Sequence, residues 1–213
     1  MKKGLFITFE GGEGSGKSTQ IQLLKKYFEM DSREVLLTRE PGGSEGAEEI
    51  RNLLLKGGVD RWDKKTEILL FCAARRDHLT KKVIPAMDTG KIVLSDRFHD
   101  STVAYQCFGY GFDQQVYDDV AYLYHFIADD FKPDLTIVLD IDPKVGVARS
   151  VKRVGNDEQR FENMDMTFHE NIRKGFLTLA EQDPNRFIVI NAEQSVEEVH
   201  QEIIEKIKGL IEW

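Results

Sequence analysis

The chain of 213 residues has an ordinary hydrophobic content of 41% and a net charge of −8. Its length predicts a single domain over residues 1–213, and no apolar run approaches the roughly 20 residues that a membrane span needs. The acidic balance argues against nucleic acid as a partner, because nucleic-acid-binding proteins usually carry a basic face. Two cysteines are too few for a disulfide framework, and the first residues lack the apolar stretch of a secretory signal. We therefore expect a cytoplasmic protein that has no contact with a membrane.

Strand and helix patterns alternate along the whole chain. Apolar runs predict five strands, at about residues 5–10, 35–39, 91–95, 135–139 and 186–190. Helical spacing predicts a first helix that carries Ile21, Leu24 and Phe28, and others at about 47–56, 66–87, 101–107, 114–129, from 144, and 165–182. Pro85 lies near the end of the helix at 66–87, where proline does least harm. This pattern predicts a three-layer α/β fold with a five-stranded parallel sheet and helices on both faces.

The last predicted helix starts with a capping box formed by Ser195 and Glu198. Apolar residues then recur at helical spacing, which predicts a single buried stripe made of Val196, Val199, Ile203, Ile207 and Leu210.

A glycine-rich segment follows the first strand and precedes the first helix. Residues 11–19 read Gly-Gly-Glu-Gly-Ser-Gly-Lys-Ser-Thr, which fits the phosphate-binding P-loop pattern G-x-x-x-x-G-K-[ST]. Glycines allow backbone N–H groups to curl around a polyphosphate, the lysine reaches its β- and γ-phosphates, and the first hydroxyl ligates Mg²⁺. The alternative is a glycine turn that binds nothing. The candidate ATP-binding residues are Gly11, Gly14, Ser15, Gly16, Lys17, Ser18 and Thr19.

Charged residues stand at the ends of the neighbouring strands. Asp96 and Arg97 follow one strand, Arg39 ends another and Asp140 a third. Ligands of open parallel sheets bind beyond the carboxyl ends of the strands, so these residues should converge with the P-loop. The carboxylate of Asp96 is the metal candidate beside Ser18, and Arg97 is a phosphate clamp. The alternative interpretation is that Asp96 caps the N-terminus of a helix and that Arg97 and Arg39 are ordinary surface residues. The five histidines show no metal-ligand spacing and are expected at the surface or in packing.

A basic segment at about residues 149–160 surrounds a glycine. It contains Arg149, Lys152, Arg153 and Arg160. Such a segment suits a lid that closes over phosphates and stabilises the transferring group, although a solvated charged face would look the same. Glu13 would repel a phosphate if it pointed into the loop, so it must face solvent or a neutral donor such as a sugar hydroxyl.

In this order and spacing, the segments at 9–19, 38–43, 70–75, 96–98, 104–106, 133–136 and 139–140 resemble the thymidylate kinases, a branch of the P-loop nucleoside-monophosphate kinases. The resemblance covers essentially the whole chain. The P-loop alone would indicate only the superfamily, whereas Arg-Glu-Pro-Gly-Gly at 39–43 and Ala-Tyr-Gln at 104–106 are typical of the thymidylate kinases.

The resemblance implies transfer of the γ-phosphoryl group of ATP to dTMP, giving dTDP and ADP for dTTP synthesis and DNA replication. Magnesium would be organised by Ser18 and Asp96, with Lys17 on the ATP side. A homodimer is also implied. The implied roles around dTMP are Glu13 with the sugar 3′-hydroxyl, Arg39 and Arg97 with the phosphate, Phe71 stacked on thymine, Arg75 and Gln106 at its polar edge, and Tyr105 against a 2′-hydroxyl.

Some members of this family carry a catalytic arginine inside the P-loop, and others supply it from the lid. Positions 12–15 hold no basic residue here, so the chain is similar to the lid-type bacterial form, with Arg149 or Arg153 as the catalytic charge besides Lys17 and Arg97. Two positions depart from the family pattern: Gln159 precedes Arg160 where an aspartate is common, and Phe98 replaces a tyrosine. A kinase for another nucleotide is the nearer alternative. A GTPase switch would need an Asn-Lys-x-Asp motif, which does not occur.

Overall fold

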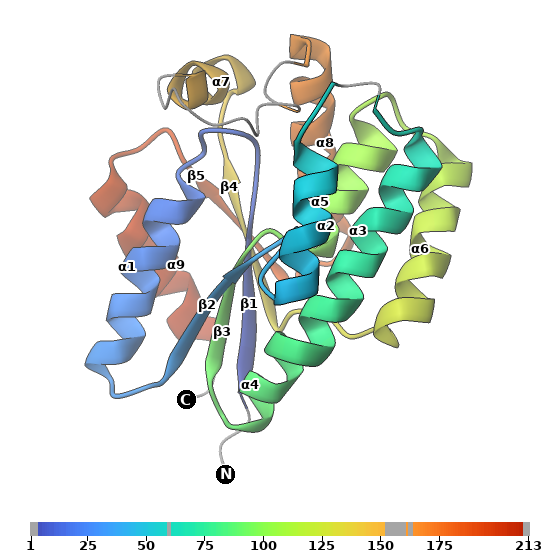
Figure 1. Ribbon diagram of the computed structural model, residues 1–213. Helices are drawn as coiled ribbons and strands as arrows, with labels where there is room; N and C mark the ends of the chain where they lie inside the picture. The colour runs from blue at the N-terminus through green and yellow to red at the C-terminus, as the bar shows by residue number, and fades with distance from the viewer. Residues whose placement is uncertain (1–3, 59–60, 152–160, 162–163, 211–213) are drawn as a thin grey trace.

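A computed structural model describes residues 4–58, 61–151, 161 and 164–210. Five parallel strands form one sheet with the order β2-β3-β1-β4-β5, which runs through the middle of the molecule (Figure 1). The strands are β1 (Leu5–Glu10), β2 (Val35–Arg39), β3 (Ile92–Asp96), β4 (Leu135–Asp140) and β5 (Phe187–Asn191). The predicted parallel sheet is confirmed, with strand ends that differ from the predicted ones by at most one residue.

Helices cover both faces of the sheet, as expected for a parallel sheet that is buried on both sides. One face carries α1 (Lys17–Met30) and α9 (Val196–Leu210), and the opposite face carries α3, α6 and α8 (Figure 1). The remaining helices are α2 (Glu45–Leu55), α3 (Lys64–His78), α4 (Ile84–Asp88), α5 (His99–Thr102), α6 (Gln114–Ala128), α7 (Pro143–Val151) and α8 (Met166–Gln182). No helix in the described residues is both long enough and apolar enough to cross a membrane.

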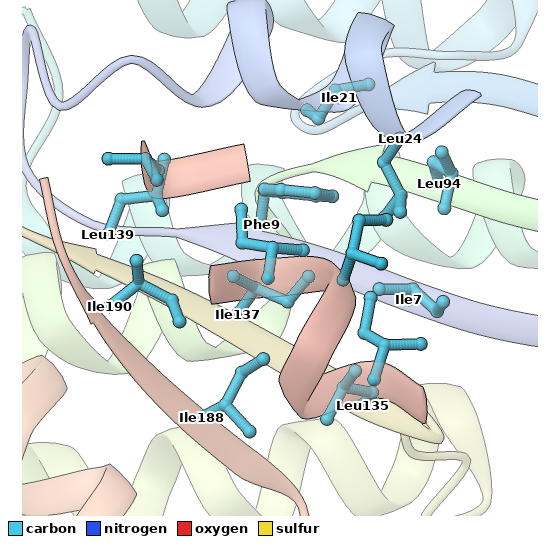
Figure 2. Close-up of a cluster of buried hydrophobic side chains, with 14 of the residues drawn as sticks. Ile7, Phe9, Ile21, Leu24, Leu94, Leu135, Ile137, Leu139, Ile188 and Ile190 are labelled. Atoms are coloured by element: carbon cyan, nitrogen blue, oxygen red, sulfur yellow. The ribbon is translucent and has the colours of Figure 1, made fainter. Parts of the chain in front are cut away.

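The core follows from the alternation of side chains along the strands. In β1, Ile7 and Phe9 face α1 and α9, where they pack with Leu24 of α1 and with residues of β4 and β5 (Figure 2). Phe6, the residue before Ile7, points to the other face and packs against Phe98. Each such side chain contributes about 1.5–3 kcal/mol when it is fully buried, so the two apolar faces hold the sheet between its helices.

Two predicted helices are interrupted by wider π-helical turns. The helix expected at 66–87 consists of α3, a π-helical turn at Leu79–Val83, and α4, which contains Pro85. Proline lacks an N–H group and its ring clashes with the carbonyl four residues earlier, and the wider turn accommodates both effects. The helix expected at 101–107 is the short α5 followed by a π-helical turn at Val103–Phe108.

The start of α9 confirms the predicted capping box. The N–H group of Ser195 donates to Glu198 Oε2 at 3.0 Å, and the N–H group of Glu198 donates to Ser195 Oγ at 3.2 Å. The predicted stripe is wrong at its first position, because Val196 in the first turn is 45% exposed and Ile204 is buried instead. The side chain of Leu210 lies outside the described residues.

Candidate active site

The register of the sheet brings the predicted residues to one edge. Phe9 of β1, which precedes the P-loop, and Arg39 of β2 both pair with Asp96 of β3. A cavity of about 340 Å³ lies at this edge, within the usual size of a small-molecule site. It is lined by the predicted residues Glu13, Ser18, Arg39, Phe71, Arg75, Asp96, Arg97 and Tyr105.

The P-loop turns directly into α1. Gly14 and Gly16 have φ values of 65° and 93°, a left-handed conformation that glycine adopts without a Cβ penalty. The ammonium group of Lys17 lies inside the loop and donates to the carbonyl oxygens of Gly11 and Gly12 at 3.0 and 2.9 Å. The loop thus holds a cation at the N-terminus of a helix, which is where a phosphate is most favourably bound.

A glycine contact joins the P-loop to α7. A Cβ atom on Gly14 would lie 2.0 Å from the carbonyl oxygen of Gly146, and one on Gly146 would lie 2.3 Å from the carbonyl oxygen of Glu13. Both positions therefore require glycine. Sequence reasoning missed Gly146, because a single glycine in a helical segment carries no signal of what packs against it.

The two predicted magnesium ligands lie next to each other. Ser18 Oγ donates to Asp96 Oδ2 at 3.1 Å. Both are hard oxygen ligands, and Mg²⁺ in kinases commonly uses one carboxylate together with substrate phosphates and water. Within the described residues, no group of three or more His, Cys, Asp or Glu side chains could hold a metal on its own. The pair fits a metal that is shared with a bound nucleotide.

Arg97 is the centre of the polar network. Its Nη1 donates to Gly11 O at 3.1 Å and to Ser101 Oγ at 3.0 Å, and its Nη2 donates to Glu13 Oε1 and Tyr105 Oη, both at 2.9 Å. Its backbone has a φ of 68°, which is unfavourable for a residue with a side chain and clusters at functional sites. The strained turn after Asp96 aims the guanidinium at the cavity.

Glu13 and Tyr105 complete this network. The hydroxyl of Tyr105 donates to Glu13 Oε1 at 2.6 Å. Burial opposes ionisation of Glu13, but the positive charges of Arg97 and Lys17 outweigh it and lower its pKa to about 2. Glu13 is therefore a carboxylate that accepts hydrogen bonds from Tyr105, a neutral donor as predicted, and also from the guanidinium of Arg97, which was not predicted.

A buried carboxyl supports Arg97 from behind. Glu10 accepts from the N–H group of Phe98 at 2.8 Å and from the Ser101 hydroxyl at 2.5 Å, which fixes the chain that follows Arg97. Burial, with the nearby charge of Asp100, raises the pKa of Glu10 to about 8. Sequence reasoning assigned Glu10 no role, since a charged residue at the end of a buried strand reads as a simple strand terminus.

The candidate base-binding residues are only partly brought together. Phe71 and Arg75, both on α3, line the cavity. Gln106 does not: its side chain is fully buried on the second π-helical turn, and its amide nitrogen donates to Glu67 Oε2 at 3.1 Å. The wider turn changes the direction of the side chains that it carries relative to a regular α-helix, and the sequence does not reveal this turn.

Several lining residues were not predicted, and two of them surround Arg75. Glu40 Oε2 accepts from Arg75 Nε at 2.8 Å, and Thr102 Oγ1 accepts from Arg75 Nη2 at 2.8 Å. Arg39 also lines the cavity, where its Nη2 pairs with Glu48 Oε2 at 3.0 Å. The other unpredicted lining residues are Pro41, Arg51, Leu55, Phe98, Ser101 and Phe161.

The predicted lid is described only at its start. Arg149 lies on α7, exposed, and its Nη1 donates to the carbonyl oxygen of Ala192 at 3.2 Å. Lys152, Arg153 and Arg160 lie outside the described residues. Asp140, at the end of β4, forms an ion pair with Arg173 of α8 and does not line the main cavity.

A P-loop on a five-stranded parallel sheet, a neighbouring serine–aspartate pair and an arginine that lines the adjacent cavity define a P-loop kinase that acts on a small molecule. The family described as Thymidylate kinase matches residues 9–203. A thymidylate kinase of Bacillus cereus is 45% identical over 97% of this chain and 98% of its own length, and one of Bacillus anthracis is 44% identical over the same shares. The crystal structure of thymidylate kinase from Ehrlichia chaffeensis matches with a TM-score of 0.77 at 36% identity, covering 96% of this chain and 99% of that one. The chain belongs to the thymidylate kinase family.

Proposed function

We propose that this protein transfers the γ-phosphoryl group of ATP to dTMP, giving dTDP and ADP. The observation that carries the proposal is the cavity beside the P-loop, in which Phe71 offers an aromatic face and Arg75 a hydrogen-bond donor. Nη1 of Arg75 is buried and has no hydrogen-bond partner among the described residues. A buried donor of this kind fits a carbonyl oxygen of a bound base.

The ATP side is formed by residues 11–19. Lys17 would leave the loop carbonyls for the β- and γ-phosphates and neutralise charge that develops during transfer. Ser18 and Asp96 would hold Mg²⁺, which when bound shields the phosphate oxygens. Arg149 and Arg153 are the candidates for a lid charge on the transferring group, and the segment at about 149–160 is the proposed lid of a single kinase domain.

The acceptor side is formed by residues of four different segments. Arg97 and Arg39 would hold the phosphate of dTMP, Glu13 would accept from the sugar 3′-hydroxyl, and Tyr105 would crowd a 2′-hydroxyl. Gln106 does not line the cavity, and its amide nitrogen is bound to Glu67, but its buried Oε1 has no hydrogen-bond partner among the described residues, so its role in reading thymine stays a prediction.

The reaction needs no strong general base. The second pKa of a phosphate monoester is near 6, so the acceptor is already mostly a dianion at pH 7. Catalysis then depends on aligning two anions and neutralising their charge, which agrees with a site rich in lysine and arginine.

Replacing Phe71 with alanine is expected to raise KM for dTMP about tenfold, with little change in kcat, because a base–aromatic stack contributes about 1–3 kcal/mol. Steady-state kinetics with dTMP as the varied substrate measures this effect. Phe112→Ala is the matched control, since Phe112 is exposed and does not line the cavity. An unchanged KM in Phe71→Ala would remove the stacking assignment.

The proposed homodimer would use the apolar residues exposed on α3 and α6. Leu69, Tyr122 and Phe126 are 54%, 71% and 75% exposed, and the two helices lie side by side (Figure 1). Phe126→Glu is expected to convert a dimer into a monomer, because it places a charge in the apolar part of the interface. Sedimentation equilibrium measures the mass, and a wild-type chain that stays monomeric at all concentrations would exclude the dimer.

The location proposed for the enzyme is the cytoplasm.

A further inference from the structure

A chain of buried polar side chains connects α3 to the turn after β2. His78, at the end of α3, is fully buried. Its Nδ1 lies 2.8 Å from Glu40 Oε1, and its Nε2 lies 2.6 Å from Thr38 Oγ1. The second oxygen of Glu40 accepts from Arg75 Nε. Neither the P-loop chemistry nor the phosphate clamp uses His78.

The chemistry of the partners fixes the direction of these hydrogen bonds. A carboxylate can only accept, so Nδ1 of His78 donates to Glu40. When the imidazole is neutral, the other nitrogen is an acceptor, and Nε2 then accepts from the hydroxyl of Thr38. In that tautomer the donors run from Thr38 to His78 and from His78 to Glu40. The carboxylate is held by one donor on each oxygen.

The contacts with Glu40 and Thr102 fix the orientation of the Arg75 guanidinium, and therefore the position of its remaining nitrogen, Nη1. Glu40 holds Nε and Thr102 holds Nη2, each at 2.8 Å. A guanidinium is planar and rigid, so two fixed nitrogens determine where Nη1 lies. Nη1 has no partner among the described residues. The Glu40 carboxylate thus provides one of the two contacts that fix the guanidinium.

The ring of His78 is also enclosed by the glycine turn. A Cβ atom on Gly43, whose φ is 91°, would lie 2.5 Å from His78 Nε2 and 2.4 Å from Thr38 Oγ1. The backbone of the turn can approach the ring only because residue 43 is glycine. His78 therefore cannot move away from Glu40 without opening the turn that lines the cavity.

We propose that His78 is a positioning residue for base selection: through Glu40 it directs Nη1 of Arg75 at the carbonyl oxygen of thymine that cytosine replaces with an amino group. This inference rests on the proposed role of Arg75. A guanidinium only donates, so it accepts a carbonyl and rejects an amino group when it is held in place. If Arg75 were free to turn, the selection against cytosine would weaken.

Two substitutions test the hydrogen bonds of the two ring nitrogens of His78 one at a time. His78→Asn places an amide nitrogen where Nδ1 was, so it keeps the donor to Glu40 and loses Thr38. His78→Gln reaches the place of Nε2, so it keeps Thr38 and loses Glu40. We expect His78→Asn to keep the ratio of kcat/KM for dTMP over dCMP, and His78→Gln to lower it about three- to tenfold through KM, with kcat little changed.

Controls distinguish this inference from the proposal on which it rests. Arg75→Met should lower the same ratio at least as far as His78→Gln does, and an unchanged ratio would remove Arg75 as the reader of the base, whatever His78 does. Thr38→Val should keep the ratio. Equal behaviour of the two His78 variants would overturn the positioning role and leave His78 as a packing residue.

A measurement on the unaltered protein covers the case in which the variants do not fold. Nitrogen-15 NMR of the ring is expected to find the proton of His78 on Nδ1, and dTMP, but not dCMP, to shift that resonance. A proton on Nε2, or the same shift with both nucleotides, would contradict the proposal.

Discussion

Replacing Lys17 with alanine is expected to lower kcat by about 10²–10³, the usual effect of removing one group that stabilises developing charge. Lys17 is the only lysine of the P-loop motif, and its Nζ lies within 3.0 Å of two carbonyl oxygens of the loop. Steady-state rates at saturating ATP and dTMP measure the effect. Lys25→Ala is the matched control on the same helix, where Lys25 pairs with Glu29 at the surface.

The pH dependence of the unaltered enzyme gives a second readout of the same charge. Burial, and then the neighbouring Arg97, lower the pKa of Lys17 to about 8. The lysine is charged below that pH and loses its charge above it, so kcat/KM for ATP should fall with rising pH above about 8, approaching about tenfold per pH unit. At saturating ATP the phosphates hold the proton on Lys17, and kcat should fall less. A profile that stays flat to pH 9.5, or a fall that persists in Lys17→Ala, would assign the titration to another group.

Replacing Arg97 with lysine is expected to lower kcat/KM for dTMP by about 10²–10³, even though the positive charge is kept. The guanidinium binds four groups through two nitrogens, among them Glu13 Oε1 and Gly11 O. An ammonium is a single point and cannot reproduce this fork. The pKa of Glu13 would also rise, because Arg97 is the largest influence that lowers it.

The control for Arg97 is a lysine substitution at an arginine outside the cavity. Arg76, on α3, has a half-exposed side chain that contacts Ile127 O and Asp129. Arg76→Lys should keep kcat/KM within about threefold, as surface pairs contribute little. An Arg97→Lys enzyme with the same mild loss would contradict the role of the fork.

The sequence predicted those parts of the fold that are determined by residues close to one another in the chain. The P-loop needs its glycines at fixed positions, the start of α9 needs Ser195 and Glu198 three residues apart, and five apolar runs make a parallel sheet. The rule that ligands bind at the carboxyl ends of parallel strands then placed Asp96 and Arg97 beside the P-loop before any contact was known.

The features that could not be predicted depend on tertiary contacts. Gln106 lies on a π-helical turn and contacts Glu67 of α3, and Gly146 is required because Glu13 O approaches it from another segment. His78 was expected to be an ordinary surface or packing residue, and only the packing of α3 against the turn after β2 reveals its contacts with Glu40 and Thr38. Each depends on partners that are distant in the sequence.

The most direct test of the central claim is a coupled ADP-release assay with ATP and Mg²⁺ and a panel of acceptors: dTMP, dUMP, dCMP, dGMP, AMP and thymidine. Strong turnover with dTMP, weaker turnover with dUMP and little with the others is expected, because the site must hold both a phosphate and a thymine face. Strong turnover with a different monophosphate would contradict the assignment of Phe71 and Arg75 to thymine. ADP release that does not depend on any acceptor would contradict the kinase reaction itself.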